Sequence, residues 1–334
     1  MLTIIVGGLV GDEGKGKVMG YLAQHDEPDF VVRAGAGPQA GHTIMPGQKV
    51  TLIPSGLTCP SARLLISRGT VINPETLLKE IEEFDIADRI GIDFGCTVIE
   101  PVHIAKDQIF KKTIGTVGTG SGPARADKVL RIAKLAKDIK SLSPYLVDTA
   151  AEINKAILAD QKILVETAQG YGLSLNDYRF YPYVTSQDVI ASQFAADMGI
   201  GPKAIDEIIV IYKSYVSRVG PGPLPRTEWS VEEIKKRGLE EIGVVSGRPR
   251  RIGPFDKELA RESLIRNTAT QAALTCIDRM FKGNERVTNW QDLTKPAQDF
   301  ISELNKFFHK HSPYFKEITL ISTGPNSEDM IDLR

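Results

Sequence analysis

Residues 2–22 of the chain read LTIIVGGLVGDEGKGKVMGYL. The apolar run at residues 2–6 has the length of a buried strand, and two glycines stop it. From Gly14 onward, the apolar residues Val18, Tyr21 and Leu22 follow the spacing of a helix. The chain is therefore predicted to open with a strand, a glycine-rich loop and a helix.

The same alternation of strands and helices continues along the chain. Further strand-like runs stand at residues 30–32, 64–66, 97–99, 163–165, 208–211 and 318–321. Asn73 before a proline and Ser230 with Glu233 predict helix starts, and residues 45–52 predict a hairpin around Pro46-Gly47. The pattern indicates an α/β fold with a mostly parallel central sheet flanked by helices.

Long loops rich in glycine, proline and arginine interrupt this pattern at residues 115–123, 217–225 and 244–253. Such loops are uncommon inside a compact domain unless they bind a ligand, so a large site built from loops is expected. No stretch resembles an interdomain linker. Residues 1–334 are therefore expected to form one domain with loop or subdomain insertions.

The composition disfavours several classes of protein. The 334 residues carry 41 Lys+Arg and 42 Asp+Glu, a net charge of −1, which argues against nucleic-acid binding and against an acidic tail. Three scattered cysteines are too few for a disulfide framework and fit a reducing cytosol. No apolar stretch approaches the ~18 residues of a membrane span, and no basic segment precedes the first apolar run. A cytoplasmic protein without a membrane segment is predicted.

The first glycine loop has the chemistry of a phosphate site. Its glycines let backbone N–H groups approach phosphate, the following helix offers its N-terminus, and Lys15 supplies a positive charge. Five residues rather than four separate Gly8 from Gly14, and Gly16 stands where a P-loop carries a Mg²⁺-binding hydroxyl. Asp12 is therefore the candidate Mg²⁺ ligand, because a carboxylate is a hard oxygen donor. The alternative is a glycine-rich turn with solvated charges.

Two further loops contain candidate binding groups. His42 follows small residues, where its imidazole could donate to a phosphate or an oxyanion, although a lone histidine is more often structural. Glycine alternates with hydroxyl residues at 115–123, and Lys128 and Arg131 follow on a predicted helix. This loop could bind a second phosphate or could simply be flexible.

Polar residues also follow several predicted strands. Gln169 and Thr185 could read the edge of a base or sugar, or could cap local structure. Residues 248–251 place three arginines in one loop, which suits a small polyanion, with nucleic-acid backbone or solvent as alternatives. Asp278 follows an apolar run and could accept from guanine, or could cap a helix.

Taken in order, the motifs of the chain resemble those of the adenylosuccinate synthetase family in its short, archaeal form. The motifs are GDEGKGK, QAGHT, LIPSG, IGTVGTGSGP, ETAQG, YPYVTS, SRVGPGPLP, SGRPRR and STGP. They extend to residue 325, and GDEGKGK together with AGHT is highly specific. The resemblance implies a fold similar to P-loop nucleoside triphosphatases and a homodimer.

The resemblance also implies a reaction. Family members ligate L-aspartate to IMP with GTP and Mg²⁺, releasing GDP and phosphate, through a 6-phosphoryl-IMP intermediate. This is the first committed step from IMP to AMP. It further implies that Asp12 accepts the N1 proton of IMP, while His42 and Lys15 stabilise the transferred phosphoryl group.

Motif matching assigns the binding residues, all as implications of the resemblance. For Mg²⁺ they are Asp12 and the Gly41 carbonyl. For GTP they are Gly11, Asp12, Glu13, Gly14, Lys15, Gly16, Lys17, Gly41, His42, Thr43, Arg250, Cys276, Asp278, Ser322 and Gly324. For IMP they are Asp12, Lys15, Gln39, His42, Thr116, Arg131 (reaching across the dimer), Gln169, Thr185 and Arg248. For aspartate they are Val244, Val245, Ser246, Gly247, Arg248 and Arg250.

The chain departs from the family pattern at five positions. Gln39 replaces an asparagine, Val117 a threonine, Thr119 and Pro249 arginines, and Cys276 a lysine. Valine has no hydrogen-bonding group, so a weaker phosphate contact is expected there. Asp278, two residues after Cys276, matches the family pattern, which favours guanine as the base.

Two other functions compete with the ligase. A GTP-dependent switch protein would carry Ser or Thr after the P-loop lysine and an NKxD-type base reader, and this sequence has neither. A small-molecule kinase could use the same phosphate cradle with a different acceptor, and its arginine loop would then bind another acid.

Overall fold

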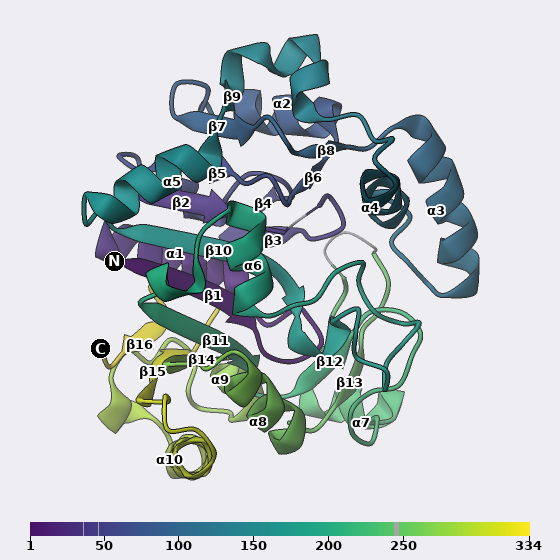
Figure 1. The fold of residues 1–334 in the computed structure, drawn as a ribbon. Helices are drawn as coiled ribbons and strands as arrows, with labels where there is room; N and C mark the ends of the chain where they lie inside the picture. The colour runs from purple at the N-terminus through teal and green to yellow at the C-terminus, as the bar shows by residue number, and fades with distance from the viewer. Residues whose placement is uncertain (36, 46, 244–246) are drawn as a thin grey trace.

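The computed structural model describes residues 1–35, 37–45, 47–243 and 247–334, and a ten-stranded sheet forms its centre (Figure 1). In spatial order the strands are β16 (Met330–Asp332), β15 (Glu317–Ser322), β14 (Gln271–Thr275), β11 (Glu207–Lys213), β1 (Leu2–Gly7), β10 (Ile163–Gly170), β2 (Phe30–Arg33), β5 (Arg63–Ile66), β7 (Ile90–Asp93) and β9 (Leu146–Val147). β16 pairs antiparallel with β15, and the other neighbours pair in parallel. The predicted α/β class is confirmed.

Helices cover the sheet because its strands are apolar on both faces. Every residue of β1 is buried, and Ile4 and Ile5 belong to two different hydrophobic clusters, one for each face. Figure 1 shows α3 and α4 side by side, and α8 next to α10. The helices are α1 (Lys15–Asp26), α2 (Pro74–Glu83), α3 (Pro101–Thr113), α4 (Ser121–Leu130), α5 (Thr149–Leu158), α6 (Ala191–Met198), α7 (Val231–Arg237), α8 (Lys257–Arg266), α9 (Ile277–Met280) and α10 (Lys295–His311).

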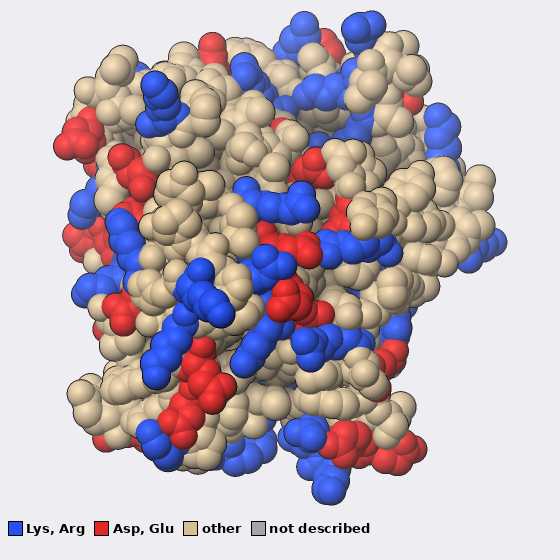
Figure 2. Space-filling model, turned by 60° about the horizontal axis from the view of Figure 1, so that its bottom comes forward, with Lys and Arg blue, Asp and Glu red and all other residues tan. Residues whose placement is uncertain are grey.

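The surface agrees with the near-zero net charge. Figure 2 shows Lys and Arg interspersed with Asp and Glu on the face that it presents. In the part of the chain that the structure describes, no helix combines the length and the apolar character needed to cross a membrane.

Several local predictions are confirmed. The chain opens with β1, a loop and α1, and the side chains of Asn73 and Ser230 accept the capping hydrogen bonds of α2 and α7. The predicted hairpin is formed by β3 (His42–Met45) and β4 (Gln48–Val50), while Pro46 lies outside the described residues.

Other predictions need correction. The run at residues 97–99 forms β8 (Thr97–Val98), which pairs with β6 (Val71–Ile72) outside the central sheet. Two of the predicted loops contain β12 (Val216–Arg218) and β13 (Arg251–Gly253), which pair antiparallel. These strands are short and contain arginine, serine or glycine, so they carry no apolar pattern. The strand pattern does not predict β7 or β14, because glycine and aspartate interrupt the apolar residues of IGID, and QAALT is rich in alanine.

The sheet order brings the candidate site residues to one edge. β1 lies between β10 and β11, so the first glycine loop emerges between the carboxyl ends of these two strands. Ligands of open parallel sheets bind at this edge. β10 also runs further than predicted and ends at Gly170, so the ETAQG motif is part of the strand.

Candidate active site

A cavity of about 970 Å³ opens at the carboxyl edge of the sheet. Most of the predicted site residues line it. They are Gly11, Asp12, Glu13, Gly14, Lys15, Gly16, Lys17, Gln39, Gly41, His42, Thr43, Thr116, Gln169, Thr185, Arg248, Arg250 and Cys276. The fold therefore assembles loops that lie far apart in sequence into one site.

The carboxylate of Glu13 holds the first glycine loop together. Its Oε1 accepts from the backbone N–H groups of Leu9 (3.1 Å) and Gly11 (2.8 Å), and its Oε2 lies 2.8 Å from Lys15 Nζ. Both charged side chains are buried. We predicted Glu13 as a GTP-binding residue, but its side chain binds the loop, so a contact with the nucleotide would come from its backbone.

Gly16 allows the hairpin that carries His42 to pack directly against α1. A Cβ atom at this position would lie 2.8 Å from the Thr43 carbonyl oxygen and 2.9 Å from His42 Cβ. A serine or threonine of the ordinary P-loop therefore has no room here. The departure noted in the sequence reflects this close contact.

Asp12 extends into the cavity from a left-handed backbone position, with φ of 61°. Its side chain is 29% exposed, and its Oδ1 lies 2.9 Å from Arg250 Nη2. Burial raises the pKa of Asp12, and the positive charge of Arg250 opposes this shift. The carboxylate thus combines access to the cavity with increased proton affinity, which are the properties of a general base.

A buried ionic network supports His42 from behind. His42 Nδ1 donates to Glu166 Oε1, which also accepts from Ser55 Oγ (2.6 Å) and lies 3.2 Å from Arg33 Nη1. Arg33 and Glu166 have no exposed side-chain surface. Neither residue is predicted as a site residue from the sequence, although a charged residue within an apolar strand is the available signal.

The charges of this network fix the state of the imidazole. Burial would raise the pKa of Glu166, but His42, Arg33 and the hydrogen bond from Ser55 lower it to about 2. Burial and the charge of Arg33 lower the pKa of His42 to about 4. Glu166 is therefore an ionised acceptor for the Nδ1 proton of a neutral His42.

The second glycine loop is anchored by α3. Asp107 accepts from Thr116 Oγ1 and from the Gly120 backbone N–H, both at 2.8 Å. Ser121 Oγ donates to Gln39 Oε1 at 2.5 Å, which leaves the amide NH₂ of Gln39 for other partners. Gln39 replaces an asparagine of the family pattern, and the bond from Ser121 fixes the position of its longer side chain.

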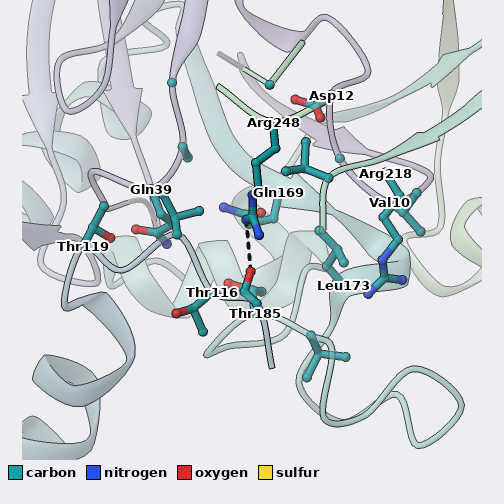
Figure 3. A pocket seen from close by; sticks show the side chains of 18 of the residues that line it. Val10, Asp12, Gln39, Thr116, Thr119, Gln169, Leu173, Thr185, Arg218 and Arg248 are labelled. Atoms are coloured by element: carbon teal, nitrogen blue, oxygen red, sulfur yellow. Dashed lines mark hydrogen bonds between the residues drawn. The ribbon is translucent and has the colours of Figure 1, made fainter. Parts of the chain in front are cut away.

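Arg248 and Arg250 of the arginine loop line the same cavity. Figure 3 shows Arg248 extending between Gln39, Gln169 and Thr185, and its Nη2 donates to the Gly115 carbonyl at 3.1 Å. Gly247 does not line the cavity in the described part of the chain. Three predicted aspartate-binding residues, Val244, Val245 and Ser246, lie outside the described residues.

Lys17 connects the loop to the residues predicted to bind guanine. Its Nζ donates to Ser322 Oγ (2.6 Å) and to the Gly324 carbonyl. Asp278 lies in the first turn of α9, not at a strand end, and its charge acts on Lys17. Ser322, Gly324 and Asp278 do not line the cavity among the described residues.

Lys17 gives this end of the site a testable pH dependence. Burial lowers the pKa of Lys17 to about 8, against the influence of Asp329, Cys276, Asp278 and Glu328. The motif predicts that Lys17 binds GTP. Below this pH its ammonium group would attract the nucleotide phosphates, whereas above this pH the amine must first take up a proton, which weakens binding. The KM for GTP is therefore expected to rise above pH 8, by up to about tenfold per pH unit. Steady-state kinetics from pH 7 to 9.5 measure this rise.

Lys17→Arg provides the control, because a guanidinium remains charged throughout this range. The KM of this variant should stay flat where that of the unmodified protein rises. Parallel profiles for the two proteins would assign the titration to another group.

Arg131 is the one predicted IMP-binding residue that lies away from the cavity in the described chain. It follows the last turn of α4 with φ of 66°, and its side chain is exposed. Val129, Leu130 and Ile132 beside it are 78%, 65% and 68% exposed. Adjacent exposed apolar side chains of this kind commonly mark a protein contact.

Comparison with known proteins identifies the family. The family model for adenylosuccinate synthetase matches residues 4–141 and 132–285. The chain is 48% identical over 338 residues to the adenylosuccinate synthetase of Archaeoglobus fulgidus, covering 99% of this chain and 98% of the relative. It is 47% identical over 341 residues to that of Methanosphaera stadtmanae, with the same coverage.

A solved structure agrees with the fold. Fully ligated adenylosuccinate synthetase from Plasmodium falciparum has a TM-score of 0.90 to this structure at 23% identity, covering 99% of each chain. The family model and the two relatives confirm the expected family, and the solved structure confirms the expected fold. The chain belongs to the adenylosuccinate synthetase family, whose members are GTP-dependent ligases that join L-aspartate to IMP.

Proposed function

We propose that the cavity catalyses this ligation in two steps through a 6-phosphoryl-IMP intermediate. The single observation that carries the proposal is that Asp12, the first glycine loop and the arginines Arg248 and Arg250 line one cavity. These groups match the needs of a base, a nucleoside triphosphate and a dicarboxylate. The product, adenylosuccinate, is the first committed intermediate between IMP and AMP.

In the first step, Asp12 accepts the N1 proton of IMP, and the purine O6 becomes an oxyanion. O6 then bonds to the γ-phosphorus of GTP, while the bond from that phosphorus to the β–γ bridging oxygen breaks and GDP leaves. Support comes from the position of the Asp12 carboxylate within the glycine loop and from the raised pKa that burial gives it.

His42 and Lys15 stabilise the charge that develops on the transferred phosphoryl group. Glu166 accepts the Nδ1 proton of His42, so donation to phosphate from Nε2 requires a second proton on the ring. The negative charge of bound phosphates favours that protonation. Lys15 pairs with Glu13 and thereby has its ammonium group held at the loop.

Asp12 and the Gly41 carbonyl are proposed to hold Mg²⁺ together with phosphate oxygens. No cluster of three or more His, Cys, Asp or Glu side chains able to hold a metal occurs among the residues that the structure describes. Mg²⁺ fits nevertheless, because it commonly takes one or two carboxylates and completes its shell with substrate phosphates and water. When bound, the ion neutralises charge on the β- and γ-phosphates.

In the second step, the amine of L-aspartate attacks C6. The new C–N bond replaces the bond from C6 to O6, so phosphate leaves with the original O6 atom, and the nitrogen loses a proton. Arg248 and Arg250 are proposed to bind the aspartate carboxylates, together with residues 244–247. Arg250 is also proposed to contact the nucleotide, because it lies beside Asp12.

The substrates are proposed to occupy different walls of the cavity. IMP contacts the group of Gln39, Thr116, Gln169, Thr185 and Arg248, which face one another in Figure 3. The GTP phosphates lie over the first glycine loop, with Gly41, His42 and Thr43 beside them. The guanine base lies toward Cys276, with Asp278, Ser322 and Gly324 near Lys17.

An assay of substrate dependence tests the function. Purified protein with Mg²⁺, GTP, IMP and L-aspartate should form a succinyl purine, and omission of any one substrate should prevent this. IMP labelled with ¹⁸O at O6 should pass the label to the released phosphate. A switch protein would hydrolyse GTP without IMP, a different kinase would leave the purine unsuccinylated, and label kept in the purine would exclude the phosphoryl intermediate.

We further propose a homodimer in which Arg131 enters the partner's site. The exposed apolar residues around Arg131 support a second copy of this chain as their cover. Arg131→Leu should reduce activity about 10²-fold, on the scale of losing a charge-assisted contact to phosphate. Mixing this variant with Asp12→Asn should restore up to roughly a quarter of the activity, because random exchange gives dimers with one intact site. Absence of recovery after subunit exchange would exclude a shared site.

A further inference from the structure

A buried glutamate, Glu241, gathers the positive charges at one wall of the cavity. It accepts from Lys213 Nζ at 2.5 Å, Arg279 Nη1 at 2.6 Å and Arg250 Nη1 at 2.8 Å, and also from the Tyr215 hydroxyl. Its side chain is only 6% exposed. The four donors come from the end of β11, the residues after it, α9 and the segment before β13, so one carboxylate joins four parts of the site.

Glu241 and Arg250 are held together twice. The Arg250 backbone N–H donates to the Glu241 carbonyl at 3.0 Å, and the two side chains form the ion pair at 2.8 Å. Arg250 then turns its other terminal nitrogen, Nη2, toward Asp12 Oδ1 at 2.9 Å. A guanidinium is a rigid planar fork, so fixing Nη1 on Glu241 also fixes the direction of Nη2.

The charges make this arrangement dependent on Glu241. Lys213, Arg250 and Arg279 bring three positive charges to one buried carboxylate. Positive charges gathered around one carboxylate repel one another strongly where water is excluded. Without the carboxylate, Arg250 keeps Asp12 as its remaining acidic partner and loses the contact that sets its position against the cavity.

We infer that Glu241 is a positioning residue that aligns Arg250 for the carboxylate of L-aspartate. Glu241 acts through Arg250 and Lys213, which line the cavity with it. The inference rests on the proposed function, in which Arg250 binds aspartate. On this inference, the carboxylate of Glu241 controls the affinity of the site for L-aspartate.

Glu241→Gln tests this inference, because it keeps the size of the side chain and removes its charge. The KM for L-aspartate is expected to rise at least tenfold. The KM for GTP should rise less, because Arg250 is only one of its many proposed contacts, and the KM for IMP should change less than threefold. Glu241→Asp, which keeps the charge on a shorter side chain, should recover part of the aspartate affinity. If the glutamine variant fails to fold, Glu241→Asp tests the inference alone, and its KM for L-aspartate should rise about threefold.

Glu228→Gln is the matched control. Glu228 pairs with Arg251, the residue next to Arg250, at 2.5 Å, and neither residue lines the cavity in the described chain. This variant should keep all three KM values. A merely structural role of Glu241 would lower the thermal midpoint and the fraction of active protein but would leave the ratio of the three KM values unchanged.

Two results would overturn the inference while leaving the proposed function intact. They are an aspartate KM in Glu241→Gln within twofold of the unmodified protein, and equal rises in all three KM values. The proposed function fails separately, if the unmodified protein forms no succinyl purine from GTP, IMP and L-aspartate.

Discussion

Replacing Asp12 with asparagine is expected to reduce the turnover number for succinyl-purine formation by at least about 10³-fold. The amide has the shape of the carboxylate but accepts no proton at the pH of the assay, so O6 of IMP stays a weak nucleophile. The substitution also removes a proposed Mg²⁺ ligand and the ion pair to Arg250 at 2.9 Å. The product is measured by its ultraviolet absorbance under saturating substrates.

The same substitution at an exposed ion pair controls for nonspecific effects. Asp26 pairs with Arg334 at 2.7 Å, and neither residue lines the cavity in the described chain. Asp26→Asn should turn over at the rate of the unmodified protein. Calorimetric titration with IMP should show binding by both variants. Turnover of Asp12→Asn within tenfold of the unmodified protein would mean that another group accepts the proton.

The sequence predicted the centre of the fold because its signals there are local. An apolar run, two glycines and helical spacing lie consecutively at residues 2–22, and the structure has β1, a loop and α1 in these places. Most motif residues also line the cavity, since the carboxyl ends of parallel strands meet at one edge. Their roles toward each substrate remain predictions.

What the sequence could not predict depends on contacts between distant segments. The loss of space at Gly16 follows from the packing of the His42 hairpin against α1. Nothing in the sequence distinguishes Glu241 from other charged residues, because its partners Lys213 and Arg279 come from distant segments. The short strand β12 forms because it pairs with β13, since its own residues have little preference for a strand.

The ion pair between Arg33 and Glu166 is the clearest contact that the sequence could not predict. Each stands among apolar residues of its strand, and 133 positions of sequence separate a charge from the counter-charge that it requires. The parallel pairing of β2 with β10 places Arg33 directly opposite Glu166. Strand register, which a single sequence does not specify, therefore creates both the ion pair and the support for His42.

Glu166→Gln is expected to lower the free energy of unfolding by about 3–5 kcal/mol, the usual range when one partner of a buried ion pair is removed. The variant leaves the Arg33 guanidinium charged and enclosed, with no exposed side-chain surface. It also removes the ionised acceptor for His42 Nδ1, so the turnover number should fall as well. Urea denaturation measures the first effect, and the succinyl-purine assay measures the second.

The structure offers a matched control for the position of this ion pair. Arg63 and Glu152 lie 3.2 Å apart but are about 30% exposed, so Glu152→Gln should cost no more than about 1 kcal/mol. Adding Arg33→Met to Glu166→Gln should recover part of the lost stability, because it removes the uncompensated charge. It should not recover turnover, since His42 still lacks its acceptor. Equal stability losses for Glu166→Gln and Glu152→Gln would show that the network does not depend on the ionised carboxylate.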